Sequence, residues 1–195
     1  QAQQLKDIPT MSISSIISQV LYPVFSNNQN ESHVIQRKLL FSIDVISYLT
    51  TALIALLILI AKPLIVILYS EKWISSVDMF QILCISGIFI SLQDVNFYLI
   101  AAKGKSRMLF ILNLVSVIIG LILKFIGAIY GGIQGLLFSI VLTSFIFYCI
   151  YAFYAAIYSQ TSIFDQFKMI IYNILLSLFS FVITYMVGNL WTLSH

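Results

Sequence analysis

The stretch FIGAIYGGIQGLLFSIVLTSFIFYCIYAFYAAIYSQTSIF, residues 125–164, decides the fold class because its 40 residues contain no charged side chain. As one straight α-helix it would be about 60 Å long, twice the roughly 30 Å thickness of a bilayer's hydrocarbon core. The pair Gly131-Gly132 lies inside this stretch, and adjacent glycines are a strong turn signal. The sequence therefore predicts two membrane-spanning helices that turn back on each other at these glycines.

The rest of the chain has the same apolar character. Of its 195 residues, 61% are hydrophobic and only 9% are charged, whereas soluble proteins average about 25% charged residues. This composition excludes a water-soluble enzyme, and a net charge of +3 on so apolar a chain excludes a basic nucleic-acid-binding face. We expect an all-α integral membrane protein with one helical domain over residues 1–195 and about six transmembrane helices. The expected spans are approximately 8–25, 39–69, 79–102, 108–130, 133–158 and 169–193.

Two features concern the course and completeness of the chain. The span at 39–69 contains Lys62-Pro63, and we expect a kink there because proline in a membrane helix more often kinks the helix than ends it. The chain begins at Gln1 without an initiator methionine or a hydrophobic leader. We therefore expect it to be a piece of a longer protein.

Positive charges predict which side of the membrane faces the cytoplasm. Three connections on one side carry six Lys and Arg residues, and the other side carries four. The excess is strongest in the short loop that holds Lys103, Lys105 and Arg107, so we place this side in the cytoplasm and the N-terminus outside. These three cations set topology in one interpretation. In the alternative they contact a lipid-linked pyrophosphate or another anionic headgroup.

The first predicted span, residues 8–25, sorts its side chains by face. Isoleucine and valine recur at helical spacing on one side. The other side carries the polar residues Ser12, Ser15, Gln19 and Tyr22. A spanning helix of this kind presents its polar face to something hydrated inside the bilayer. We therefore expect these four residues to line a substrate pathway.

Polar groups within the other spans are costly in a bilayer, so they usually face a bundle interior or an aqueous cavity. Asp94 lies eight residues before Ala102, about 12 Å from the helix end, and is flanked by Gln93 and Asn96. We expect these three polar residues either to bind substrate or a coupling cation, or to be satisfied by neighbouring helices. Lys124 either reaches the outer interface with its long side chain or faces an anionic substrate in a cavity.

Three stripes of like residues recur at helical spacing in the later spans. Two consist of small and polar residues, which are typical of hydrogen-bonded helix contacts and less often of a pore lining. One is Asn113, Ser116, Gly120, Lys124 and Gly127, and the other is Asn173, Ser177, Ser180, Thr184 and Gly188. The third stripe predicts an interfacial aromatic belt or, alternatively, a surface for stacking sugars. It consists of Tyr148, Tyr151, Tyr154 and Tyr158.

The chain shows no pattern typical of catalysis. Its two histidines are His33 and His195, and it lacks the HExxH and GxSxG patterns of hydrolases. Its two cysteines lie in apolar stretches, where they are most simply small hydrophobic residues. We therefore expect no enzyme activity, no catalytic residues, no metal site and no cofactor.

Several segments resemble the polysaccharide transporter family. They are Ala2-Gln3-Gln4-Leu5 with Pro9, Tyr22-Pro23-Val24-Phe25-Ser26, Lys62-Pro63-Leu64-Ile65, Tyr69-Ser70-Glu71-Lys72-Trp73 and Ala101-Ala102-Lys103-Gly104-Lys105-Ser106. The members of this family are Wzx-like lipopolysaccharide and O-antigen flippases of the multidrug/oligosaccharidyl-lipid/polysaccharide exporter superfamily. The likeness runs in order across about the first 107 residues.

The resemblance implies a fold of two six-helix lobes around a central cavity, of which this chain would be most of the C-terminal lobe. It implies alternating access that moves undecaprenyl-diphosphate-linked oligosaccharides outward across the bacterial inner membrane. These oligosaccharides are precursors in the biosynthesis of cell-surface polysaccharide. The partners would be the lipid bilayer, this lipid-linked substrate and the N-terminal lobe of the same chain. A drug or small-solute exporter of the same superfamily and a membrane enzyme of polysaccharide assembly are the alternatives.

Overall fold

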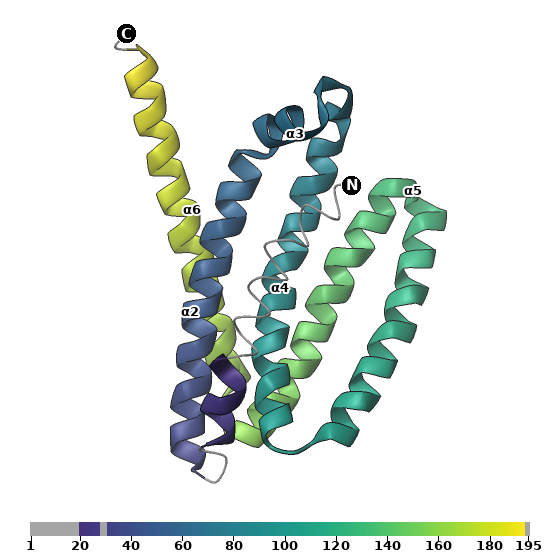
Figure 1. Ribbon diagram of the computed structural model, residues 1–195, viewed down its shortest axis with the longest axis vertical. Coiled ribbons are helices and arrows are strands. Elements are labelled where there is room, and N and C mark those ends of the chain that lie inside the picture. Colours follow the sequence, from purple (N-terminus) through teal and green to yellow (C-terminus); the bar gives the residue numbers. More distant parts are fainter. Residues whose placement is uncertain (1–19, 28–30, 194–195) are drawn as a thin grey trace.

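The computed structural model describes residues 20–27 and 31–193, with side chains described as far as residue 180. These residues form helices joined by short connections, so the all-α prediction is confirmed. Figure 1 shows the long helices running side by side. A helical stretch at 20–26 is followed by α2 (Ser32–Leu59), α3 (Ala61–Tyr69), the 3-10 helix η1 (Glu71–Ser76), α4 (Val77–Ala102), α5 (Ser106–Ser159) and α6 (Ile163–Leu193).

Four helices in the described part of the chain are long and apolar enough to cross a membrane. The predicted spans at 108–130 and 133–158 both fall within α5, whose helical conformation is interrupted at Gly132 between them. Most of the predicted span at 8–25 lies outside the described residues. Five of the six expected spans therefore correspond to four helices that could cross a membrane, one of which has two arms. Their ranges are Ser32–Leu59, Glu71–Ala102, Ser106–Ser159 and Ile163–Ser180.

The turn expected at Gly131-Gly132 is present in α5. Gly132 has φ 57° and ψ −140°, a conformation that residues with a side chain rarely adopt. The two arms of α5, before and after Gly132, lie side by side (Figure 1). Near the turn they approach so closely that a Cβ atom added to Gly127 would lie 2.5 Å from the Gly135 carbonyl oxygen. Glycine at both positions therefore permits the tight hairpin.

The predicted span at 39–69 is divided by a break at Ile60. α2 ends at Leu59, and α3 runs across the end of the bundle instead of continuing the direction of α2 (Figure 1). Pro63 is the third residue of α3, and it has no N–H group to donate to the Leu59 carbonyl. Helical bonding resumes where the Leu64 N–H donates to the Ile60 carbonyl over 2.9 Å. The expected kink is thus a complete change of helix direction.

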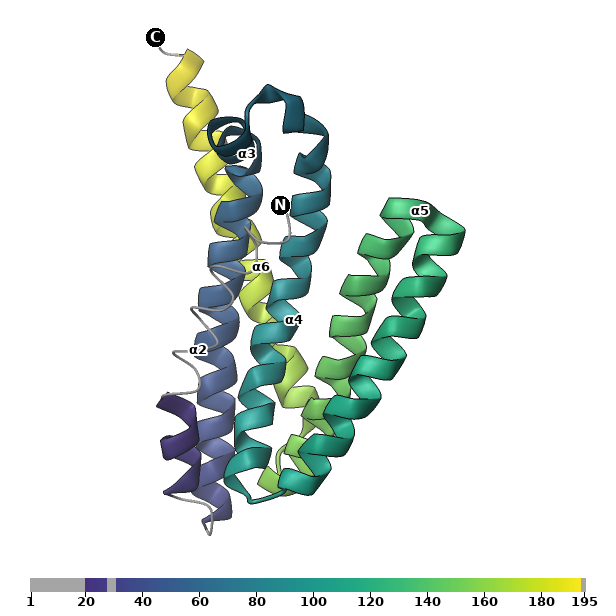
Figure 2. The same ribbon diagram turned by 45° about the vertical axis from the view of Figure 1, so that its right-hand side comes forward.

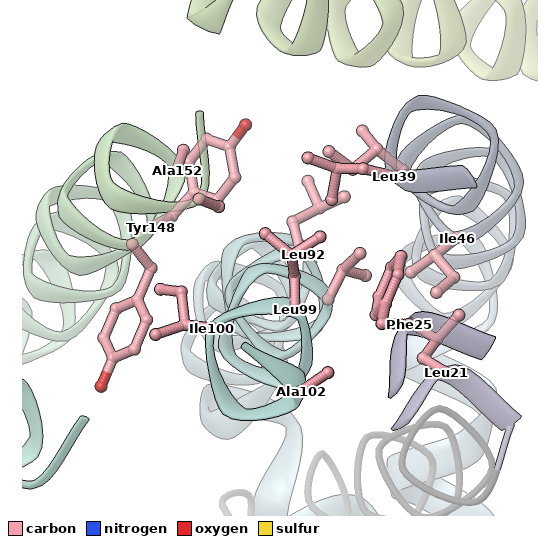
Figure 3. Close-up of a cluster of buried hydrophobic side chains, with 14 of the residues drawn as sticks. Leu21, Phe25, Leu39, Ile46, Leu92, Leu99, Ile100, Ala102, Tyr148 and Ala152 are labelled. Atoms are coloured by element: carbon pink, nitrogen blue, oxygen red, sulfur yellow. The ribbon is translucent and has the colours of Figure 1, made fainter. Parts of the chain in front are cut away.

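The helix α4 lies between α2 and α5, and α2 also packs against α6. The main hydrophobic core joins these helices with the stretch 20–26. Figure 3 shows Leu21 and Phe25 of that stretch pointing toward α2 and α4, where Ile46 and Leu99 lie. Close packing of such side chains stabilises the bundle through dispersion contacts, because lipid tails are as apolar as the side chains themselves.

The connections lie at the two ends of the bundle, as in a membrane protein that crosses back and forth. Figure 1 shows the start of α2, the α4–α5 connection and the α5–α6 connection at one end. The segments α3 and η1 and the Gly132 turn lie at the other end (Figure 1). One end thus holds the three connections that the excess of positive charge assigns to the cytoplasm.

Candidate functional site

A polar pocket of about 280 Å³ lies between α4 and the two arms of α5. Two residues predicted for a substrate pathway meet there: Gln93 comes from α4, and Lys124 comes from the first arm of α5. The second arm contributes Thr143 and Ser144. The volume is just below the roughly 300–1,000 Å³ of small-molecule sites. The pocket can therefore enclose a small polar group or one part of a larger ligand.

Helical spacing explains how the first arm of α5 forms one wall of this pocket. Ser116, Gly120 and Lys124 follow one another at intervals of four residues, so they share one face of the helix. Gly120 is buried, and a Cβ atom there would lie 3.3 Å from the Thr143 methyl carbon. The absence of a side chain at Gly120 lets the two arms approach each other between the levels of Ser116 and Lys124.

The hydroxyl groups of the pocket are available mainly as hydrogen-bond acceptors. Each donates its proton to a carbonyl of its own helix, over 2.8 Å for Ser116, 2.6 Å for Thr143 and 3.0 Å for Ser144. Their oxygen lone pairs therefore remain for a ligand that donates, such as one with hydroxyl groups. The half-buried Lys124 adds three donors and a positive charge. This combination suits a ligand that carries both hydroxyl groups and negative charge.

Asp94 lies beside a second polar contact, whose two partners belong to stripes that the sequence showed. The Tyr151 hydroxyl donates to the Asn113 side-chain oxygen over 2.9 Å and so joins the two arms of α5. Asp94 is half-buried on α4 and interacts electrostatically with Tyr151. Asn113 belongs to a polar stripe for which hydrogen-bonded helix contacts were predicted, and this prediction is confirmed at Asn113.

The prediction of an interfacial tyrosine belt is wrong for Tyr148 and Tyr151. Their exposed fractions are 1% and 0%, and both lie in the core that α4, α5 and α6 share. The Tyr148 ring packs edge-on against Phe167 of α6, with ring centroids 5.7 Å apart. The alternative of stacking against sugars fails for the same two residues. Helical spacing identified their common face, but it does not tell whether that face meets lipid or another helix.

Asn96 lies on a different face of α4 from Asp94. It is fully buried, and its side-chain amide donates to the Leu92 carbonyl of its own helix over 3.1 Å. Among residues 20–27 and 31–193, its side-chain oxygen has no hydrogen-bond partner. The structure therefore brings Gln93 and Lys124 together at one pocket and leaves Asn96 in the core.

The remaining expected pathway residues belong to the first predicted span. Ser12, Ser15 and Gln19 lie outside the described residues. Tyr22 lies in the helical stretch 20–26, where 47% of its surface is exposed, whereas the neighbouring Leu21 is buried in the core. Tyr22 thus faces away from the core, and it does not line the polar pocket.

The cationic loop lies between α4 and α5, at the opposite end of the hairpin from Gly132. Lys105 and Arg107 are exposed, and Lys103 is half-buried. The Lys105 Nζ atom lies 5.6 Å from the centre of the Tyr158 ring, which is a cation–π geometry. The loop presents positive charge at one end of the bundle, and its contact with an anionic headgroup stays a prediction.

The polar stripe of α6 contacts α2 through Asn173. Its side-chain amide donates to the Asp44 carboxylate over 3.0 Å and to the Ser47 hydroxyl over 2.6 Å. The hydrogen-bonded helix contact predicted for this stripe is confirmed at Asn173. It also gives the Asp44 carboxylate a partner within the bundle. Across the part of the chain that the structure describes, no group of three or more His, Cys, Asp or Glu side chains is placed to hold a metal ion.

Comparison with known proteins shows relatives among membrane proteins of polysaccharide biosynthesis. Residues 1–78 match the family model described as a polysaccharide biosynthesis protein. The chain is 28% identical over 109 residues to the teichuronic acid biosynthesis protein TuaB of Bacillus subtilis, covering 56% of this chain and 23% of TuaB. It is 30% identical over 127 residues to an uncharacterised membrane protein from the cps region of Klebsiella pneumoniae, covering 65% and 26% of the two chains.

A third relative is the lipopolysaccharide biosynthesis protein WzxC of Escherichia coli, which is 25% identical over 142 residues. The match covers 71% of this chain and 28% of WzxC. The chain thus spans about a quarter of the length of the curated relatives it matches. No solved structure matches it. The resemblance to this family is confirmed at the level of membrane proteins of polysaccharide biosynthesis, over part of the relatives' length.

Proposed function

Because the chain is a membrane protein related to the Wzx-like family of polysaccharide biosynthesis, we propose that it forms part of an exporter of lipid-linked oligosaccharide or polysaccharide precursors. It would supply most of the C-terminal lobe of a two-lobe transporter that works by alternating access in a bacterial inner membrane. The substrate pathway would pass the pocket between α4 and the two arms of α5. One observation carries this proposal: Gln93 and Lys124, from different helices, line one polar pocket within spanning helices.

The depth of Lys124 supports a role in binding. It lies eight residues before Gly132, which is about 12 Å along the helix from the turn. A charge at this depth is costly unless it faces water or an anionic group. Its place in a polar pocket supports the cavity interpretation over one in which the side chain only reaches the outer interface.

The chemistry of the pocket matches a lipid-linked sugar. Such a precursor has sugar hydroxyl groups, which can donate to the oxygens of Ser116, Thr143 and Ser144. Its phosphate groups are negatively charged and can accept from the Lys124 ammonium. The names of the relatives TuaB and WzxC refer to teichuronic acid and lipopolysaccharide biosynthesis, which supports a cell-surface polysaccharide precursor as the cargo.

A transport assay tests the role of Lys124. The full-length protein would be reconstituted in vesicles with a fluorescent lipid-linked oligosaccharide, and the rate of its movement between leaflets would be measured. Lys124→Gln should slow transport by about tenfold to a hundredfold, since a hydrogen bond to a charged group contributes about 1.5–3 kcal/mol. Lys124→Arg should retain most of the rate because it keeps the charge.

The matched control is Lys72→Gln, which removes a positive charge from an exposed residue of η1. This variant should transport at the rate of the unmodified protein. Equal rates for Lys124→Gln and Lys72→Gln, in vesicles that hold equal amounts of folded protein, would remove the pocket from the proposed pathway.

A further inference from the structure

The short helix α3 and the adjoining η1 expose large apolar side chains at the end of the bundle opposite the cationic loop (Figure 1). Apart from Lys62 and Tyr69, α3 consists of apolar residues. The exposed side chains, with their exposed fractions, are Ile67 (81%), Leu68 (52%), Trp73 (44%) and Ile74 (43%). Exposed apolar side chains gathered in this way mark a contact with a membrane or with another protein.

The opposite face of α3 packs on the bundle. Ala61 and Ile65 lie four positions apart, so they share one face of the helix, and both are buried. The core that they join also contains Ile54 of α2 and Phe80 and Cys84 of α4. Pro63 and Ile67, which are again four positions apart, are both exposed. The helix is therefore apolar on two faces, of which one meets the bundle and the other meets the surroundings of the protein.

The lengths of the neighbouring helices give the depth of α3 in the membrane. Leu59, the last residue of α2, lies 21 residues after Lys38, which is about 32 Å along the helix. On α4, Asp78 lies 24 residues before Ala102, which is about 36 Å. Both distances exceed the roughly 30 Å thickness of the hydrocarbon core. When the cationic ends of these helices lie at the inner boundary of that core, α3 and η1 lie at its outer boundary.

The orientation and the side chains of this segment fit the same depth. Figure 2 views α3 nearly along its own axis while α2 and α4 run vertically, so α3 lies across the direction of the spanning helices. The rings of Tyr69 and Trp73 have their centroids 6.4 Å apart, and these two residue types are enriched where membrane meets water. With three residues per turn in η1, the exposed Lys72 and Ser75 share one side, and Trp73 lies on another.

We propose that α3 and Trp73 form an interfacial anchor, in which the outward face of α3 lies among phospholipid at the boundary between the head groups and the acyl chains of the outer leaflet. Phospholipid is the occupant because the face is apolar and lies at this boundary, with a polar side of η1 next to it, as in helices that lie in the membrane surface. The anchor also explains why apolar sequence continues past Leu59. Residues 61–69 lie along the interface, so they do not lengthen the span of α2.

Depth-dependent quenching of fluorescence tests the proposal. The full-length protein, with its native cysteines replaced by alanine, receives Ile67→Cys and an environment-sensitive NBD label. It is then reconstituted in vesicles of phosphatidylcholine and phosphatidylglycerol, in which some of the phosphatidylcholine carries a nitroxide quencher near the start of an acyl chain or near its far end. The label at position 67 should show the blue-shifted emission of an apolar site. It should lose most of this emission to the shallow nitroxide and little to the deep one.

Two control labels calibrate the depth. Ser75→Cys, on the polar side of η1, should emit as in water and lose little emission to either nitroxide. Ile118 is 50% exposed and lies 11 residues after Arg107, about 17 Å along α5 and so near the middle of the bilayer. A label on Ile118→Cys should therefore lose most of its emission to the deep nitroxide.

Three outcomes would overturn the interfacial anchor. A response at position 67 equal to that of Ser75→Cys would place α3 in water, and one equal to that of Ile118→Cys would place it in the hydrocarbon core. Blue-shifted emission that neither nitroxide quenches would mean that protein covers the outward face. The vesicles contain no transported lipid, so each result is independent of the proposed transport and of the role of Lys124.

Discussion

Tyr148 and Tyr151 lie less than one turn apart on α5 and are equally buried, but their hydroxyl groups have different surroundings. The Tyr151 hydroxyl donates to Asn113 across the hairpin. Within the described ranges of the chain, the Tyr148 hydroxyl has no hydrogen-bond partner. A buried polar group without a partner costs about 1–3 kcal/mol, whereas a satisfied hydrogen bond contributes about 0.5–1.5 kcal/mol. Loss of the hydroxyl should therefore have opposite effects at the two positions.

We predict that Tyr151→Phe lowers the free energy of unfolding by about 0.5–1.5 kcal/mol, because Asn113 loses its interhelical donor. Tyr148→Phe should be neutral or stabilising, since it removes a polar atom and no bond. Unfolding of the purified protein in detergent, followed by its thermal midpoint, measures both changes with each variant as the control for the other. A larger loss for Tyr148→Phe than for Tyr151→Phe would show that the Tyr148 hydroxyl has a partner.

Lys124 illustrates how one residue acquires a role from its neighbours. Alone in a spanning segment it could extend its side chain toward the interface. In the folded chain it lines one pocket with Gln93 and the hydroxyl groups of the second arm. Its charge is therefore surrounded by polar groups within the bundle. The proposed contact with a phosphate depends on these neighbouring polar groups.

At the scale of elements, the α5 hairpin depends on the absence of side chains where its arms approach most closely. Gly127 and Gly135 face each other, and a Cβ atom at either position would collide with the backbone of the other. Gly131, by contrast, has no atom within 4 Å of the position a Cβ would occupy. These three of the four glycines near the turn are therefore not equivalent, although the sequence alone does not distinguish them.

We predict that Gly135→Ala destabilises the protein by about 1–3 kcal/mol, because the added methyl group forces the arms apart. Gly131→Ala should be tolerated or should stabilise by up to about 1 kcal/mol, since alanine favours a helix more than glycine does. The thermal midpoint and the yield of monodisperse protein compare the two variants. Comparable losses of stability in both variants would contradict the close approach of the arms at Gly135.

The polar pocket and a second pocket of about 740 Å³, which is lined mainly by apolar side chains, also depend on how elements are arranged. Both are formed where α4 meets the hairpin, one beside Gln93 and the other beside Phe89. These two residues lie four positions apart on α4, so they share one face of that helix. A single face of α4 therefore contributes to both pockets.

At the scale of the whole molecule, the connections at one end of the bundle carry the cationic loop, and those at the other end carry η1 and the Gly132 turn (Figure 1). Positive charge near the ends of spanning helices is retained in the cytoplasm. The two ends should therefore lie on opposite sides of the membrane, with the loop that contains Lys105 inside.

Cysteine labelling of intact cells checks this orientation. In a variant of the full-length protein with Cys84 and Cys149 replaced by alanine, Ser75→Cys in η1 should react with a membrane-impermeant maleimide. Ser162→Cys, at the α5–α6 connection, should react only after the membrane is permeabilised. Both serines are exposed, so access to the reagent rather than burial decides the result. Labelling of Ser162→Cys alone in intact cells would reverse the orientation.

Local physics made part of this fold predictable. The uncharged stretch 125–164 is too long for one crossing, so a reversal at the adjacent glycines followed from bilayer thickness alone. The break at Ile60 had a local cause in Pro63, although the new direction of α3 did not. The site was less predictable, because a polar residue in a spanning helix indicates only that it needs a partner. Gln93 lines the polar pocket, whereas Asn96, three residues later, lies in the core.

By itself the sequence determined that this is an all-helical membrane protein. Its apolar stretches have the length of spanning helices, and a helix satisfies every backbone polar group of its own segment within the lipid. It also determined where the long hairpin turns. The tertiary structure decided which helical faces meet: it buried the tyrosines, paired Asn173 with Asp44, and set Lys124 beside Gln93. The reason is that helical periodicity specifies which residues share a face, whereas the partner of that face depends on packing between helices distant in the chain.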